Sequence, residues 1–374
     1  MKLSEARAGV PLEVRNRELE FSYYPMRRTN RRWGLHSMLY AAEPWGVISG
    51  SVTAGARTAQ DAAAAKSFVR QAHEYFQAAG RASTIETRPL LYYYCFLNLA
   101  KAVAIGRGRP NLVGKLTHGI ADVGGTPHTV AAARVQLQPS GPRVPTVVDE
   151  LHHALEGRSV ASGEYPIRDV LAQSVVAHRM WREATHPLRR ERFMPIDRIR
   201  FFTSDDARAV WTRVEIRREA LESRGRTLLK TVASAGLSSD FRAVRDAAAP
   251  TSVHVIEEQL PHSYTGRSAD VVMDAIATLR PNLWQTVTSA PPYRRFYLYM
   301  SEAGEARLPQ WLSVYAVFFW LGSLTRYQPV ELLEALEGPY GPFFREFLET
   351  QPTQLLYMLA SEAKRQDVSR AAVV

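Results

Sequence analysis

The sequence predicts an α+β protein whose helical core comes from the N- and C-terminal thirds of the chain. Residues 88–105 and 308–327 are almost wholly apolar over lengths typical of buried helices. Between them lie short runs of branched and aromatic residues, which predict strands. We therefore expect three parts. Residues 1–125 form an N-terminal arm and the first part of the helical core, residues 126–305 a strand-containing middle insert, and residues 306–374 the second part of the core.

Composition bounds the function classes. The 374 residues carry a net charge of +10, with 41 arginines and 6 lysines, so a polyanion such as RNA or a nucleotide is the first expected partner. The same arginine excess can follow from genomic base composition. The single cysteine, Cys95, excludes an internal disulfide and a zinc site of several cysteines, and it favours a reducing, cytoplasmic compartment. The N-terminus lacks the apolar stretch of a signal peptide.

A basic arm near the N-terminus could bind phosphates and stack on a base. Its residues are Arg27, Arg28, Arg31, Arg32 and Trp33. A solvated arm or a contact between subunits is the alternative interpretation. Arg107 and Arg109 lie in a second basic segment, a glycine-rich loop after the first apolar helix, and are further candidates for nucleic-acid binding.

Two helices are expected before that loop. Residues 62–79 are amphipathic and end at Gly80. Residues 88–105 begin with a proline that suits a first helical turn. On this second helix Tyr94, Asn98 and Lys101 fall within about 60° of one another. They form either a satisfied polar network or part of a site that binds a phosphate or a carbonyl.

Further elements follow from the same patterns. Strands are predicted at residues 130–137, 199–203, 210–216, 253–256 and 294–300, and helices at 167–185, 308–327, 330–336, 343–348 and 353–364. The helix over 308–327 has a continuous apolar core shorter than a membrane span requires, so we expect a buried helix and no membrane partner.

Candidate catalytic residues are few, because no phosphate loop, dinucleotide fingerprint, nucleophile elbow or zinc motif is present. No metal or cofactor is therefore expected. His118, in the turn Thr117-His118-Gly119, could act as a general acid or base, or simply anchor the turn. Arg326 could bind an anion or only complement the helix dipole. If the two apolar helices pack together, Lys101, His118 and Arg326 could line one basic pocket, with Asn98 and Tyr94 beside it.

Two segments resemble the YaaC-like family of bacterial proteins. They are residues 88–102, RPLLYYYCFLNLAKA, with THGI at 117–120, and residues 308–329, LPQWLSVYAVFFWLGSLTRYQP. The first segment is also similar to a helix of the HEPN superfamily, in which a Tyr-Tyr helix ending in Ala-Lys-Ala precedes a Thr-His turn. That resemblance implies a helical HEPN-like core. It also implies RNA or nucleotide recognition, with metal-independent nucleases of stress and phage defence among the members.

The nuclease members of that superfamily carry an arginine, then four to six other residues, then a histidine, on a late helix. In this chain only the pairs Arg31/His36 and Arg179/His186 have this spacing, and neither lies in the C-terminal helices. The leading hypothesis is recognition of RNA or a nucleotide, with or without nuclease activity. The alternatives are a non-enzymatic subunit that binds a protein partner through its apolar helices and basic arm, and an enzyme acting on a small phosphorylated metabolite. The protein partner could be a second copy of the chain, in a homo-oligomer.

Overall fold

The computed structural model describes residues 3–14, 16–25, 38–109, 112–114, 116–125, 129–185 and 191–370. Of these residues, 46% are helical and 19% lie in strands. The chain divides into two compact units, each made from two stretches of sequence. Unit 1 comprises residues 1–39 and 190–305, and unit 2 comprises residues 40–189 and 306–374.

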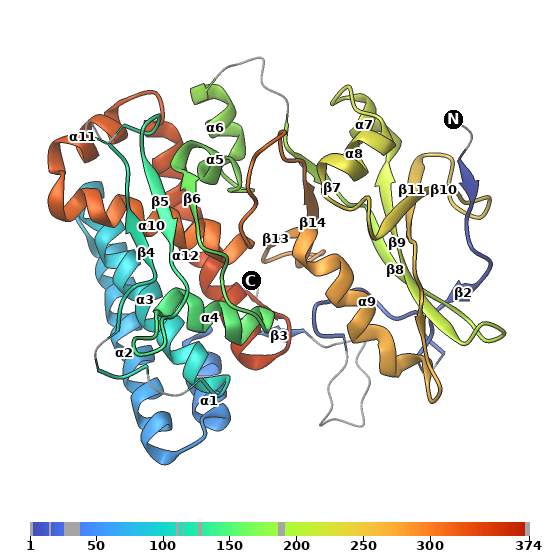
Figure 1. Ribbon diagram of the computed structural model, residues 1–374, viewed down its shortest axis with the longest axis horizontal. Helices are drawn as coiled ribbons and strands as arrows, with labels where there is room; N and C mark the ends of the chain where they lie inside the picture. The colour runs from blue at the N-terminus through green and yellow to red at the C-terminus, as the bar shows by residue number, and fades with distance from the viewer. Residues whose placement is uncertain are drawn as a thin grey trace. The chain divides into compact units, whose positions relative to one another are not determined.

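Unit 1 contains two sheets and three short α-helices among its described residues. The strands are β1 (Ser4–Glu5), β2 (Val10–Pro11), β7 (Phe193–Pro195), β8 (Arg198–Ser204), β9 (Ala209–Arg217), β10 (Phe241–Arg245), β11 (Val253–Glu258), β12 (His262–Ser263), β13 (Leu283–Val287) and β14 (Arg294–Tyr299). The helices are α7 (Arg218–Glu222), α8 (Leu228–Ser234) and α9 (Val272–Leu279). The larger, mixed sheet has the order β1-β10-β11-β9-β8-β2, with β12 paired to β9, and the smaller has the order β13-β14-β7 (Figure 1).

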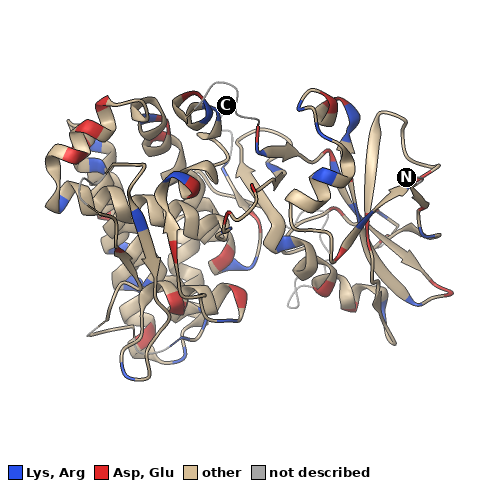
Figure 2. Cartoon of the chain, turned by 45° about the horizontal axis from the view of Figure 1, so that its top comes forward, with Lys and Arg blue, Asp and Glu red and all other residues tan. Residues whose placement is uncertain are grey.

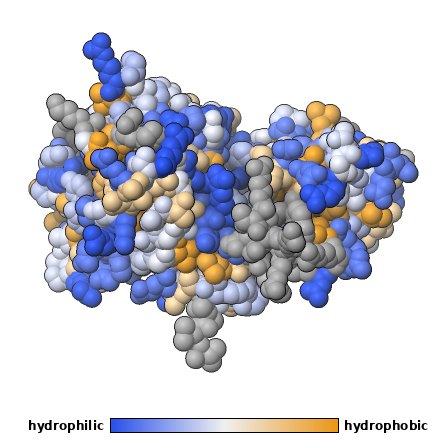
Figure 3. All heavy atoms as spheres, turned by 90° about the horizontal axis from the view of Figure 1, so that it is seen from below, coloured by the Kyte–Doolittle hydropathy of each residue, from blue (hydrophilic) through white to orange (hydrophobic). Residues whose placement is uncertain are grey.

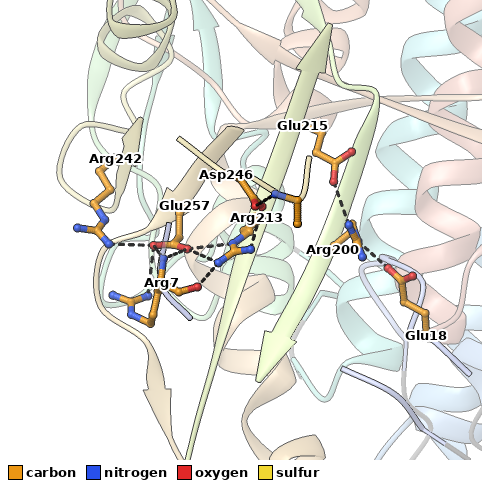
Figure 4. A network of polar contacts seen from close by, with 9 residues as sticks. Arg7, Glu18, Arg200, Arg213, Glu215, Arg242, Asp246 and Glu257 are labelled. Carbon is orange, nitrogen blue, oxygen red and sulfur yellow. Dashed lines mark hydrogen bonds and ion pairs between the residues drawn. The ribbon is translucent and has the colours of Figure 1, made fainter. Parts of the chain in front are cut away.

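One face of the larger sheet carries a row of charged side chains. Arg200, Arg213, Glu257 and Arg242 are successive cross-strand partners on β8, β9, β11 and β10. Glu257 is fully buried and accepts hydrogen bonds from Arg213 Nε at 2.9 Å, Arg242 Nη2 at 3.0 Å and the backbone N–H of Arg7 at 3.0 Å (Figure 4). Because a buried carboxylate needs such partners, this network ties the N-terminal segment to the sheet.

The opposite face of the same sheet forms the core of unit 1. Phe201, Val214 and Ile256 alternate with the charged residues along their strands and are buried. They join Ile276 and Leu279 of α9 in one apolar cluster. The alternation therefore separates a charged face from an apolar face.

Unit 2 is mainly helical but contains a small antiparallel sheet. The helices are α1 (Trp45–Gly55), α2 (Ala59–Arg81), α3 (Arg88–Gly106), α4 (Val147–Glu156), α5 (Ile167–Ala172), α6 (His178–Thr185), α10 (Gln310–Tyr327), α11 (Pro329–Glu337) and α12 (Gly341–Lys364). The sheet has the order β4-β5-β6, from β4 (Ile120–Asp122), β5 (Arg134–Leu137) and β6 (Gly163–Pro166). A separate pair joins β15 (Val368–Ser369) to β3 (Leu39–Tyr40).

Helix α3 lies at the centre of unit 2, where it contacts α1, α2, α4, α10 and α12 (Figure 1). The ring of Phe318 on α10 stacks on Phe96 with centroids 5.2 Å apart and lies 5.6 Å from the ring of Tyr92. A Cβ at Gly322 of α10 would lie 3.2 Å from the Cβ of Tyr93. The two apolar helices of the sequence therefore pack directly on each other, with a glycine at the closest approach.

Most predicted elements are confirmed, with small differences at their ends. The helices expected at 62–79, 88–105, 308–327 and 330–336 are α2, α3, α10 and α11, and the strands expected at 199–203, 210–216, 253–256 and 294–300 are β8, β9, β11 and β14. The strand expected at 130–137 begins only at Arg134. The helix expected at 167–185 is two helices, α5 and α6.

The two helices expected at 343–348 and 353–364 are one helix, α12, with Pro352 in its interior. A proline there removes one backbone hydrogen bond, which usually ends a helix. Both sides of Pro352 are anchored by buried apolar residues, including Phe347 and Leu355, and this packing offsets the loss.

The expected fold class, α+β with a helical HEPN-like core from the N- and C-terminal thirds and a strand-containing middle insert, is wrong, because the fold is a mixed α/β structure with a curled mixed sheet. Residues 1–39 belong to the strand-rich unit, where β1 pairs with β10 and β2 with β8. Residues 126–189 belong to the helical unit and supply β5, β6 and helices α4 to α6. Periodicity along the chain does not show pairing between segments about 200 residues apart, so these partners were missed.

The surface mixes charges and isolated apolar groups. Figure 2 shows Lys and Arg interspersed with Asp and Glu on helices and strands of both units. On the face shown in Figure 3, hydrophobic atoms form small groups separated by hydrophilic ones. None of the described helices combines the length and hydropathy that crossing a membrane requires.

The α1–α3 contact generates a stability prediction. A Cβ at Gly106 would lie 2.6 Å from the Cα of Val52, so Gly106→Ala should destabilise the protein by about 1–3 kcal/mol through overpacking. Gly50 is exposed on α1 with nothing within 4 Å of the same position, so Gly50→Ala should stabilise it by about 0.5–1 kcal/mol. Urea unfolding measures both changes; equal effects of the two variants would contradict the close approach.

Candidate functional site

The three polar residues of α3 share the face that packs against α2. Tyr94 stacks on Tyr75 with ring centroids 5.6 Å apart, Asn98 Nδ2 donates to Gln71 Oε1 at 3.5 Å, and Lys101 Nζ lies 5.1 Å from the ring centroid of Phe68. Asn98 is buried, whereas Tyr94 and Lys101 are half-buried. The helical spacing in the sequence therefore identified one face correctly.

His118 is held by a turn that is fixed to the start of α4. The carbonyls of Thr117 and His118 accept hydrogen bonds from the backbone N–H groups of Val147 and Val148, at 3.0 and 3.2 Å. Gly119 has φ +79°, and a Cβ there would lie 2.6 Å from a side-chain oxygen of α4's N-cap. Only glycine suits this position, so the backbone of the turn that carries His118 is held against the start of α4.

The imidazole of His118 points to the tyrosines of α3. Its Nδ1 is hydrogen-bonded to the hydroxyl of Tyr93, whose ring is buried. Burial raises the pKa of Tyr93 well above its usual range, so the phenol stays protonated. Burial, then the charge of Arg326, then that of Lys101 lower the pKa of His118 from its ordinary 6.5. The imidazole is therefore neutral near pH 7.

Arg326, in the last turn of α10, lies among the same aromatic rings. Its Nη1 donates to the hydroxyl of Tyr94 at 3.3 Å. Its Cζ is 5.7 Å from the ring centroid of Tyr93, 5.9 Å from that of Tyr94 and 4.9 Å from that of Tyr327. The guanidinium thus complements the helix C-terminus and also sits in a set of cation–π contacts.

We name Lys101, His118 and Arg326 the basic cluster, because the charges of Arg326 and Lys101 both act on His118. Within the described part of the chain, none of the three forms an ion pair with a carboxylate. Burial lowers the pKa of Lys101, which shows how little solvent compensates its charge. Half-buried cations without a counter-charge favour an anionic ligand.

The other predicted binding residues have different surroundings. Arg107 Nη2 pairs with Glu362 Oε2 at 3.3 Å, and Arg109 Nε pairs with Glu150 Oε2 at 2.5 Å. Each arginine is thus neutralised within unit 2. The basic arm, Arg27, Arg28, Arg31, Arg32 and Trp33, lies outside the described residues, as do His36 and His186 of the two nuclease-like pairs.

Three tyrosines of the site were not among the predicted site residues. Tyr93 is the hydrogen-bond partner of His118, Tyr75 stacks on Tyr94, and Tyr327 lies against Arg326. The Tyr92-Tyr93-Tyr94 run was a usable signal, because consecutive helical residues point about 100° apart and reach different neighbours. Among the described residues, no group of three or more His, Cys, Asp or Glu could hold a metal ion.

The electrostatics generate a titration prediction. The pKa of His118 should lie below 6.5, and it should rise in Lys101→Met and rise more in Arg326→Gln, because each change removes a positive charge that disfavours the imidazolium. NMR titration of the His118 ring measures these values. Arg245→Gln, which removes an exposed charge in unit 1, should leave the titration unchanged; a response to it equal to that of Arg326→Gln would refute local coupling.

Comparison with known proteins identifies the family. The chain matches the YaaC-like protein family over residues 36–363, which include the helices α3 and α10 and the turn that carries His118. Searches of curated proteins and of solved structures gave no significant match. Since the match spans most of its length, the chain belongs to the YaaC-like family.

Proposed function

We propose that unit 2 binds the phosphate groups of RNA or of a nucleotide at the basic cluster. The observation that carries the proposal is the absence of any carboxylate ion pair at Lys101, His118 and Arg326 in the described residues. Lys101 and Arg326 are cations on two different helices, and no carboxylate of a described residue compensates their charges. A phosphate is a compact anion that accepts hydrogen bonds from Lys101 and Arg326, and from Nε2–H of His118 in the tautomer whose Nδ1 accepts from the Tyr93 hydroxyl.

The surroundings suit such a ligand. Tyr94 and Lys101 are half-buried and Arg326 is partly accessible, so the cations are both desolvated and reachable. Partial desolvation strengthens a charge-assisted hydrogen bond relative to one in bulk water. The tyrosine hydroxyl of Tyr94 adds a neutral donor and acceptor beside Arg326.

Salt dependence tests the proposal. The logarithm of the association constant for single-stranded RNA should fall linearly with the logarithm of salt concentration. Each phosphate contact that is removed should reduce the magnitude of this slope by about 0.7. Lys101→Met and Arg326→Gln should each weaken binding and reduce the slope by about that amount. Fluorescence anisotropy of a labelled RNA over a salt series measures both quantities.

The matched control is Arg245→Gln. It removes one positive charge at an exposed residue of unit 1, so it keeps net charge equal to that of Arg326→Gln. We expect it to change neither affinity nor slope appreciably. If all three variants weaken binding to the same degree, the binding reflects net charge and the proposed site is wrong.

Metal-independent RNA cleavage is a second candidate function. The observation that favours it is the neutral His118, whose Nε2 makes no hydrogen bond to any described residue. With Nδ1–H donated to the Tyr93 hydroxyl, Nε2 accepts the proton of a ribose 2′-hydroxyl as that oxygen attacks phosphorus. The P–O5′ bond breaks, Lys101 gives a proton to the departing oxygen, and the products are a 2′,3′-cyclic phosphate and a 5′-hydroxyl.

Incubating the protein with RNA in a metal chelator tests cleavage directly. His118→Ala should lower the cleavage rate by about 100-fold or more, which is the usual contribution of a positioned acid or base. A strand of the same base sequence with 2′-deoxy sugars should resist cleavage, because it lacks the attacking hydroxyl. Cleavage that needs a divalent metal, or that persists in His118→Ala, would rule this candidate out. Binding at the basic cluster does not depend on the outcome.

The alternative class, a subunit that binds a protein partner through its apolar helices, would have to use other surfaces. On α10, the residues from Gln310 to Leu324 are buried inside unit 2, and α3 is buried over most of its length. A role in bacterial stress or phage defence stays a prediction.

A further inference from the structure

Tyr327 differs from the other tyrosines at the basic cluster because its ring is open to solvent. It is 67% exposed, whereas Tyr93 is buried and Tyr94 is half-buried with one face stacked on Tyr75. The Tyr327 ring lies 4.9 Å from the guanidinium carbon of Arg326 and makes no ring–ring contact with any described residue. An exposed aromatic ring thus borders an arginine that has no carboxylate partner in the described part of the chain.

We propose that Tyr327 is a stacking platform for an unpaired base whose neighbouring phosphate contacts Arg326, so that the ligand is a single-stranded RNA or a free nucleotide. This inference rests on the proposed function, since it names the chemical class that the same site selects. It adds a group that recognises the base, which the basic cluster alone does not provide.

The geometry gives the reason. A base that stacks on Tyr327 needs a free π-face, and the exposed ring supplies one. In a nucleotide the base and its phosphate are joined through one sugar, so both reach side chains that are adjacent in sequence. Inorganic phosphate has no ring to stack, and the bases of a duplex have both faces covered by neighbouring pairs. The contact therefore discriminates by the presence of an unstacked base.

The experiment compares two probes on the full chain. One is a labelled oligouridylate of about twelve nucleotides, within the range of one single-strand-binding module, and the other is an abasic strand of the same length and charge. Tyr327→Leu should weaken oligouridylate binding by about 5- to 100-fold and leave abasic binding unchanged, while Tyr327→Trp should retain the wild-type preference.

A matched control separates stacking from general loss of aromatic surface. Tyr264 of unit 1 lies 5.6 Å from the guanidinium carbon of Arg208, so Tyr264→Leu removes an equivalent tyrosine–arginine contact elsewhere. We expect it to affect neither probe. An effect of Tyr264→Leu as large as that of Tyr327→Leu would overturn the stacking assignment.

The outcomes distinguish the two proposals. If Arg326→Gln weakens both probes but Tyr327→Leu changes neither, or changes both equally, the stacking platform is wrong and phosphate binding stands. If Arg326→Gln changes neither probe, the proposed function fails and the stacking platform fails with it. A duplex RNA that binds as tightly as oligouridylate would also overturn the inference.

Discussion

The burial of α3 on all sides is the constraint on which unit 2 depends. This helix contacts five other helices, and its side chains from Cys95 to Ala100 are all buried. Each large apolar side chain taken out of water contributes about 1.5–3 kcal/mol to folding. The fold of unit 2 is therefore stable only when the other helices cover α3. Glycines at the closest approaches, Gly106 of α3 toward α1 and Gly322 of α10 toward α3, let the backbones come near enough for this packing.

That packing decides where the polar groups of α3 emerge. Tyr94, Asn98 and Lys101 lie along α2, and Tyr93 reaches across to the turn that holds His118. The last turn of α10 brings Arg326 to the same tyrosines. Other elements cover an apolar helix that carries a few polar residues, and those polar residues are held where the covering elements meet. The basic cluster is a consequence of this arrangement.

The buried charges of the larger sheet in unit 1 are paired with opposite charges, unlike those of the basic cluster in unit 2. Four arginines on and beside this sheet pair with four carboxylates in two groups, one around Glu257 and one around Arg200, and each of these arginines has an acidic partner (Figure 4). In unit 2, Arg107 and Arg109 also have carboxylate partners. Among the described residues Arg326 has no carboxylate partner, and this distinguishes the basic cluster from these structural ion pairs.

The sequence by itself determined the long helices, the main strands and the shared face of Tyr94, Asn98 and Lys101, because these depend on local periodicity. It also singled out His118 and Arg326, a titratable and a charged residue beside apolar segments. It led to the wrong fold class, since β1 and β2 are two-residue strands whose partners lie about 200 residues away. Only the tertiary structure decided that Arg109 pairs with Glu150 while Arg326 has no acidic partner among the residues that the structure describes, because pairing depends on distances that the order of residues does not contain.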